Sequence, residues 1–346
     1  MEGAVSLDDG AFTVASTGTR YAGAMLDVLF EGDQLRIGTL QLLDDNGERL
    51  EGSGTLRLQG RRVQEVDLTI KANEFKVLGN ELGDLSVDTT LNIYGTLLSP
   101  TVAGLVRVHA GRLEVDALVD RFTSNAYAVP QNGPTPGQGM AAAEPSGPTF
   151  DVAVQVPGNL VLRGRDIRPA DATVALGDVN VTVGGDFSIR GQPGGDPVLF
   201  GTVTAVRGTY SFQGRRFELL RDGTIAFRGE QPIDPSLDLQ AERVIAGIVA
   251  HVNIDGTMHS PSLTLSSRPP LDESDILSLI LFSQPVNRLG AAQREAVGER
   301  AVGLAGGFVC RPSRIPSSTR STLTSSSSRP LLKAGAPRLP SASASS

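Results

Sequence analysis

The chain has 346 residues, of which 40% are hydrophobic, 5% are aromatic and 40 are glycine. This length suffices for one long or two ordinary domains, but few large aromatic side chains are available for a compact globular core. The net charge of −7 is unevenly placed: residues 311–346 hold six basic and no acidic residues, which leaves 25 basic and 38 acidic residues elsewhere. Such an acidic body argues against binding to nucleic acid or to an anionic membrane surface.

Cys310 is the only cysteine, so an internal disulfide and a cysteine-based metal site are excluded. A body without cysteine fits an oxidising compartment such as the periplasm. Residues 1–16 contain no signal peptide, and no apolar run reaches 18 residues. The alternating pattern is already under way at Ala4, and we therefore expect a fragment of a longer protein.

Residues 1–120 alternate between apolar and polar side chains in short runs, such as Leu35–Ile37, Val66–Ile70 and Leu91–Tyr94. Period two over runs separated by Gly, Asp and Asn predicts β-strands. We expect residues 1–120 to form one segment of a curled β-sheet. Residues 121–148 break the pattern with many Pro and Gly residues, which predicts a flexible loop.

The alternation resumes over residues 149–268, which we expect to form a second segment of the same sheet. A weak repeat runs through both segments: Gly, a few polar residues, Pro, and then an alternating strand. It begins at Gly95, Gly191 and Gly256, so the starts are 96 and 65 residues apart. This irregular spacing argues against a propeller or a solenoid of identical coils.

The pattern changes after Pro269-Pro270, where residues 269–306 read as a helical segment. A very apolar helix is predicted at 273–282, with Asp272 as its N-cap and Asp275 as the partner in a capping box. Its Ile and Leu residues cover most of its circumference, so it must be buried, and we expect it to cover the open end of the sheet. A second helix is predicted at 291–304. Residues 307–346, rich in Ser, Arg and Pro, should be disordered.

The strands carry more apolar surface than about thirty helical residues can cover. A closed sandwich would bury this surface, whereas a folded-over sheet would leave it as a groove that offers acyl chains about 0.8 kcal/mol per buried methylene. We expect a charge at Val181 or Phe212 to block lipid before it abolishes folding. The residues predicted to line the groove are Leu160, Leu162, Val174, Leu176, Val181, Val183, Phe187, Ile189, Tyr210, Phe212, Ile225, Phe227, Leu237, Leu239, Val252, Ile254, Leu263 and Leu265.

Catalytic and metal-binding patterns are not found in the sequence. It has no phosphate loop, no Gly-x-Ser-x-Gly elbow and no His-Glu-x-x-His motif. The three histidines are scattered, and His251 alternates with an apolar face and so reads as a solvent-side strand residue. We predict a protein that is not an enzyme and that uses no cofactor and no metal; a β-helix hydrolase would need clustered carboxylates.

Several runs in the second half resemble one known family. They are Asn159–Ile167 (NLVLRGRDI), Arg207–Leu219 (RGTYSFQGRRFEL), Asp222–Gly229 (DGTIAFRG), Ile254–Ser267 (IDGTMHSPSLTLSS) and Pro269–Phe282 (PPLDESDILSLILF). On these residues the chain is similar to the C-terminal region of the TamB-type translocation and assembly module proteins, within the AsmA-like superfamily. The resemblance covers about 150–306 and, with less specific motifs, 1–120.

The resemblance implies an all-β fold: an elongated sheet curled into a taco-like or β-solenoid-like groove, with a short C-terminal helical segment. Members of the family are anchored in the inner membrane by an N-terminal helix and span the periplasm of Gram-negative cells. They are implicated in moving phospholipids toward the outer membrane. They also assemble or secrete outer-membrane proteins together with the barrel protein TamA.

The resemblance therefore implies phospholipids and a TamA-type barrel protein as partners, and it implies no nucleic acid. In the family, further strands follow the helices and contact the barrel. In this chain the Ser/Arg/Pro tail stands in their place, which a shifted reading frame would explain. The expected function is that of a periplasmic lipid conduit and outer-membrane biogenesis factor. The alternative is a structural β-solenoid or an adhesin-like passenger that transports no lipid.

Overall fold

A computed structural model describes residues 2–60, 62–117, 146–167 and 177–307. The predicted loop at 121–148 lies outside these residues up to residue 145, and the predicted tail lies outside them from residue 308. Val174 and Leu176, two of the predicted groove residues, also fall outside the described part of the chain.

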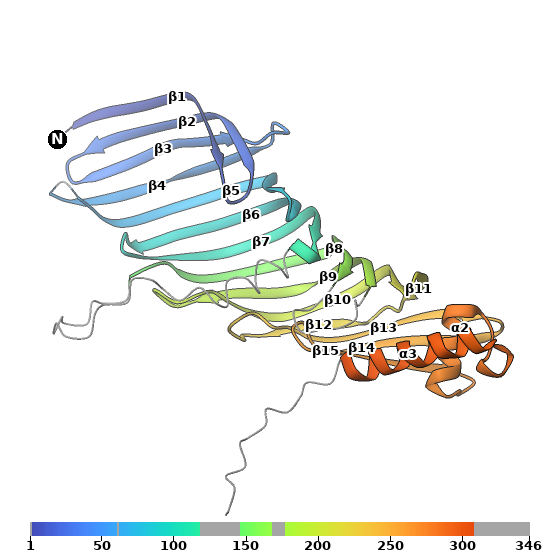
Figure 1. The fold of residues 1–346 in the computed structure, drawn as a ribbon. Helices are drawn as coiled ribbons and strands as arrows, with labels where there is room; N and C mark the ends of the chain where they lie inside the picture. Colours follow the sequence, from blue (N-terminus) through green and yellow to red (C-terminus); the bar gives the residue numbers. More distant parts are fainter. Residues whose placement is uncertain (1, 61, 118–145, 168–176, 308–346) are drawn as a thin grey trace, which may run out of the picture. The chain divides into compact units, whose positions relative to one another are not determined.

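One sheet contains all fifteen strands of the described residues, and their order in the sheet follows the sequence closely (Figure 1). The ladders between neighbours are antiparallel except for the parallel ladder between β7 and β8. The single sheet of strands confirms the all-β prediction. The strands are β1 (Glu2–Val14), β2 (Thr19–Glu31), β3 (Gln34–Leu43), β4 (Arg49–Gln59), β5 (Arg62–Asn80), β6 (Gly83–Thr96), β7 (Ser99–Glu114), β8 (Thr149–Ile167), β9 (Gly177–Gly191), β10 (Val198–Phe212), β11 (Arg215–Leu219), β12 (Thr224–Arg228), β13 (Ser236–Ile245), β14 (Ile248–Thr257) and β15 (Pro261–Arg268).

Strands β11 and β12 behave as one interrupted strand. Both pair with β10 on one side and with β13 on the other. The interruption at residues 220–223 is held in the sheet by backbone hydrogen bonds, including one of 2.8 Å from the N–H of Ala205 to the carbonyl of Gly223. The sheet is therefore continuous from β1 to β15.

The sheet curls at its N-terminal end, because the turn between β1 and β2 packs against β5, three strands away. The N–H of Gly79 donates to the carbonyl of Thr17 at 3.0 Å, and the Asn80 amide donates to the carbonyl of Ser16 at 3.2 Å. The rings of Tyr21 and Phe75 stack with their centroids 5.2 Å apart.

β-Bulges provide the bend. The register shifts within the ladders β2–β3, β5–β6, β6–β7, β7–β8, β8–β9 and β9–β10. A bulge inserts residues on one strand, bends that strand and increases its right-handed twist. Asp44, which is 5% exposed, fixes one such site: its carboxylate accepts the N–H of Lys76 at 2.7 Å, next to the bulge between Ala72 and Phe75.

Helix α2 spans Glu273–Phe282, as predicted, and α3 spans Ala291–Gly307, three residues beyond its predicted end. A short 3₁₀ helix, η2 (Val286–Arg288), separates them. The predicted capping box is wrong. Asp272 occupies the N-cap position, but its side chain makes no capping hydrogen bond. The carboxylate of Asp275 instead accepts the N–H of Val286 at 2.9 Å, because η2 folds back against the start of α2.

The sequence repeat corresponds to a repeated turn at two of its three positions. The β6–β7 and β14–β15 hairpins both pair the glycine with the proline across the turn, Gly95 with Pro100 and Gly256 with Pro261. In each turn a Thr hydroxyl accepts the N–H of the Ser three residues later, at 3.3 and 3.2 Å. At the third position, Gly191 and Val198 are joined by a longer connection.

A substitution at Gly201 in β10 tests whether the bent sheet requires a glycine at this position. Its φ is +138°, and a Cβ there would lie 2.5 Å from the Asp186 carbonyl oxygen. We expect Gly201→Ala to destabilise the protein by about 1–3 kcal/mol through backbone strain. Gly298→Ala is the control, because Gly298 lies in α3 with open space around it and the change should stabilise by about 0.5–1 kcal/mol. Chemical denaturation measures both; equal effects of the two changes would contradict this account.

Candidate functional site: the apolar face of the sheet

Apolar side chains form rows that run across the strands on one side of the sheet, which we call the apolar face. One row consists of Val5, Val28, Ile37, Gly54, Leu68, Ile93, Val102 and Phe150, from β1 to β8. A second consists of Leu7, Leu26, Leu40, Gly52, Ile70, Leu91, Gly104, Val152, Ile189 and Leu199, from β1 to β10. Because side chains alternate along a strand, the side chains of each row point to one face. Gly54 in the first row and Gly52 and Gly104 in the second add no side chain to it.

Much of this face stays accessible in the first strands. Val5 is 56% exposed and Leu7 is 49% exposed, and Leu68, Ile70 and Leu91 are only half-buried. The helices α2, η2 and α3 follow β15 and lie beside the last strands of the sheet (Figure 1). Residues from β1 to β7 therefore present apolar surface that neighbouring side chains only partly cover.

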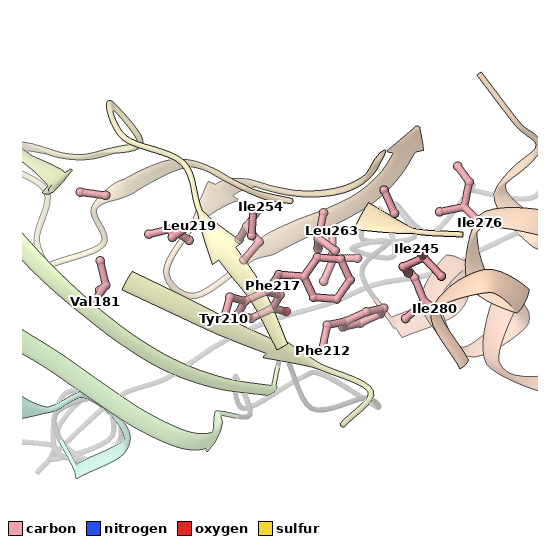
Figure 2. Packing of buried hydrophobic residues seen from close by; sticks show 14 of the residues in the cluster. Val181, Tyr210, Phe212, Phe217, Leu219, Ile245, Ile254, Leu263, Ile276 and Ile280 are labelled. Carbon is pink, nitrogen blue, oxygen red and sulfur yellow. The ribbon is translucent and has the colours of Figure 1, made fainter. Parts of the chain in front are cut away.

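The other end of the apolar face is closed by a hydrophobic cluster (Figure 2). Val183, Phe212, Phe217 and Val252 are each at most 1% exposed there. Burial of this kind contributes about 1.5–3 kcal/mol for each large side chain before the loss of conformational entropy.

Most of the predicted groove residues belong to this cluster. Its buried members from the prediction are Leu160, Val181, Val183, Tyr210, Phe212, Val252, Ile254 and Leu263. Partly buried against them are Leu162, Phe187, Ile225, Phe227, Leu237, Leu239 and Leu265. Ile189 lies in the second row instead, between Val152 and Leu199. The structure thus gathers these side chains, while their role as a lipid lining stays a prediction.

The residues between them lie on the opposite, polar side of the sheet. Asn180 and Asp238 are exposed. Asn253 is half-buried, and its amide donates to the Thr264 hydroxyl at 3.4 Å and to the Ser266 hydroxyl at 3.2 Å. His251 also lies on this side, as predicted, although its side chain is only 16% exposed and is 3.8 Å from the Glu242 carboxylate.

Helix α2 supplies part of the cluster. Ile276, Leu277, Leu279 and Ile280 are between 0% and 2% exposed, and they share the cluster with Leu263 and with side chains of β10, β11, β13 and β14. Ser278 is also buried, and its hydroxyl donates to the carbonyl of Gln284, so the polar atom is satisfied. The helix therefore closes the apolar face beside β15.

The charged side chain of Arg215 lies at this apolar end. Arg215 pairs with Phe212 across the β10–β11 hairpin. Its Nε donates to the carbonyl of Ile280 at 3.1 Å, and its Nη2 donates to the carbonyl of Leu281 at 2.9 Å. The last carbonyls of a helix lack intrahelical donors and carry partial negative charge. The guanidinium therefore satisfies the C-terminus of α2 from the sheet.

Sequence reasoning missed Arg215, although the alternation Arg215-Phe217-Leu219 places it on the inward side. It also missed the contribution of Ala241 and Ala250, both 0% exposed, because small side chains give a weak hydrophobic signal.

Two further groups set the local electrostatics. Burial raises the pKa of the Tyr210 hydroxyl well above its ordinary value. Asp234 precedes β13 and contacts the β14–β15 turn, and burial alone would raise its pKa. Hydrogen bonds from the backbone and imidazole of His259 and from Thr257 outweigh burial and hold that pKa below its usual value.

Within the described residues, no group of three or more His, Cys, Asp or Glu side chains is placed to hold a metal ion. None of the described helices is both long enough and apolar enough to cross a membrane.

The fold and the site define a class of protein: a single curled β-sheet with one continuous apolar face. The comparison with known families identifies the family to which this protein belongs. Residues 38–312 match the model of the TamB C-terminal domain, and the chain belongs to the TamB family. It is 24% identical over 246 residues to the translocation and assembly module subunit TamB of Haemophilus influenzae. That alignment covers 69% of this chain and 18% of the relative, so the chain spans about a fifth of the relative's length.

Truncation of one α2 side chain tests the closure of the apolar face. Ile280 is 1% exposed. We expect Ile280→Ala to lower the free energy of unfolding by about 2–5 kcal/mol, since it leaves a cavity in a packed cluster. Val244→Ala in β13 is the control, because Val244 is 66% exposed and the change should stay within about 0.5 kcal/mol. A small effect of Ile280→Ala would mean that α2 does not pack as described.

The lowered pKa of Asp234 predicts a pH dependence with a definite sign. A carboxyl group with a depressed folded-state pKa stabilises the protein above its unfolded value, 3.8, and that stability is lost as the pH falls through the folded-state pKa. We therefore expect Asp234→Asn to lower Tm near neutral pH. The Tm difference from the unmodified chain should shrink when the pH is lowered from 5 toward about 2. Thermal unfolding followed at several pH values checks this, and a pH-independent difference would contradict it.

Proposed function

We propose that this chain carries phospholipid acyl chains along the apolar face of its sheet. The observation that carries the proposal is the second apolar row, which crosses ten strands in register and is half-buried over most of its length. An acyl chain laid along such a row gains about 0.8 kcal/mol for each methylene it removes from water. On the other side of the same strands, apolar side chains such as Leu29 and Leu105 are exposed singly, at 43% and 40%, and the rows across the strands lie on the apolar face.

Family membership supports the wider role. The Haemophilus influenzae relative is a translocation and assembly module subunit. We propose by this relationship that the chain works in a Gram-negative cell envelope, on the periplasmic side, as part of an inner-membrane-anchored protein. It would support the assembly or secretion of outer-membrane proteins with a TamA-type barrel partner and would do so without catalysis.

The exposures of the apolar residues decide where this proposal is best tested. Val181 and Phe212, the blocking positions expected from the sequence, are 5% and 1% exposed and lie in the closed cluster. A charge there would disrupt folding, because an unpaired buried charge costs several kcal/mol. Leu91 is a better position, since it is half-buried in the second row, at a distance from the cluster.

We expect Leu91→Asp to weaken the binding of a fluorescent-acyl phospholipid about tenfold, because it removes roughly two methylene contacts and adds a charge to the row. Asn92→Asp is the matched control. It puts the same side chain at the next residue of β6, on the polar face, and it keeps the oxygen that accepts the Thr69 hydroxyl at 3.0 Å.

Lipid titration gives both affinities, and circular dichroism checks that both variants keep the sheet. Equal weakening by the two changes would contradict binding on the apolar face. No binding by the unmodified chain would favour a purely structural sheet.

A further inference from the structure

Helix α2 covers one end of the apolar face with aliphatic side chains, which are hydrocarbon like the acyl chain of a lipid. Four aliphatic side chains of α2 are at most 2% exposed, in one cluster with inward side chains of β10, β11, β13, β14, β15 and the strands before them. The apolar rows that begin at β1 reach β8 and β10, and the inward side chains continue through Leu239, Ile254 and Leu263 to β15. At that end α2 already covers them.

The helix depends on the sheet for its own stability. It has ten residues, and isolated helices of this length are marginal in water. Its N-cap side chain makes no capping hydrogen bond, and its last turn contains no basic residue. The donors to the carbonyls of Ile280 and Leu281 come from Arg215 of β11, at 3.1 and 2.9 Å. Undocked from the sheet, α2 would lose both its apolar partners and its charge compensation.

The geometry points to α2 as a built-in stopper: it fills the end of the apolar face in place of acyl chains, and lipid occupies that end only when α2 undocks. Arg215 is the positioning residue that holds the stopper in place. This inference rests on the proposed function and deepens it by naming the segment that controls how far lipid reaches. A lipid that binds only the undocked state shifts the protein toward that state, by an amount set by its affinity.

Neighbouring arginines offer a matched pair of variants. Arg215→Ala removes the two hydrogen bonds to α2. Arg216→Ala makes the same change in charge one residue later, on the polar face, where the side chain is exposed. A third variant acts in the opposite direction: Ser283, the C-cap of α2, has a φ of +58°, and its N–H donates to the carbonyl of Leu279 at 2.9 Å. Ser283→Gly relieves that strained conformation and keeps the hydrogen bond.

The experiment measures hydrogen exchange of the α2 amides in the full chain, relative to the amides of β9. Exchange is measured with and without vesicles of phosphatidylethanolamine and phosphatidylglycerol that carry a fluorescent-acyl phospholipid. We expect Arg215→Ala to raise α2 exchange about tenfold or more, since two hydrogen bonds from a charged group are lost, and to increase the lipid bound per chain. Arg216→Ala should change neither quantity, Ser283→Gly should slow α2 exchange, and vesicles should speed it in the unmodified chain.

The outcomes separate the stopper from the proposed function. If lipid binds in a Leu91-dependent manner but leaves α2 exchange unchanged in both the unmodified chain and Arg215→Ala, the stopper is overturned and the proposed function stands. If no variant binds lipid, the proposed function fails and the stopper fails with it. If Arg215→Ala does not fold, slower α2 exchange and less bound lipid in Ser283→Gly support the stopper, and unchanged values in that variant overturn it.

Discussion

A single-layered β-sheet sends successive side chains to opposite faces, so its behaviour in water depends on what shelters the apolar half. In this chain most apolar residues lie on one face, in rows that cross the ladders from β1 to β8 and from β1 to β10 and in the cluster that continues to β15. A shift of one residue in any strand would turn its apolar side chains toward the polar side and interrupt every row that it crosses. Keeping register while bending the sheet over its apolar face is therefore the constraint that the other features serve.

The β8–β9 bulge meets both demands at once. Between Val156 and Leu160, β8 advances four residues while β9 advances two, from Gly185 to Val183. Both steps are even, so the apolar side chains point to the same face before and after the bend. At the other end of the sheet, the stacked rings of Tyr21 and Phe75 close the curl from within. Local irregularity thus shapes the sheet without breaking the apolar rows.

The sequence predicted what depends on short-range patterns. Period-two alternation identified the inward residues, and the Pro-Pro step before a dense apolar run located α2 to the residue. It could not predict what depends on partners distant in the chain. Asp275 has the spacing of a capping-box residue, yet its carboxylate accepts the N–H of Val286 instead. Ile189 and Val181 have similar surroundings in the sequence. Ile189 is half-buried and Val181 is 5% exposed, because only Val181 lies in the cluster that α2 completes. The bulges have no composition signal of their own.

The same property of the apolar face both stabilises the fold and offers a binding surface, and the two uses compete for area. Side chains closed into the cluster contribute to folding and are lost to a ligand. Side chains of β1–β7 left half-exposed cost solubility unless something apolar covers them. Arg215 lies within the part of the face that the chain covers itself, opposite Phe212 in the β10–β11 hairpin. A guanidinium is tolerated at the edge of an apolar cluster only when its donors are satisfied, and here the partners are the terminal carbonyls of α2. The charge and the helix end therefore stabilise each other, and the two hydrogen bonds of Arg215 fasten α2 to the sheet that it covers.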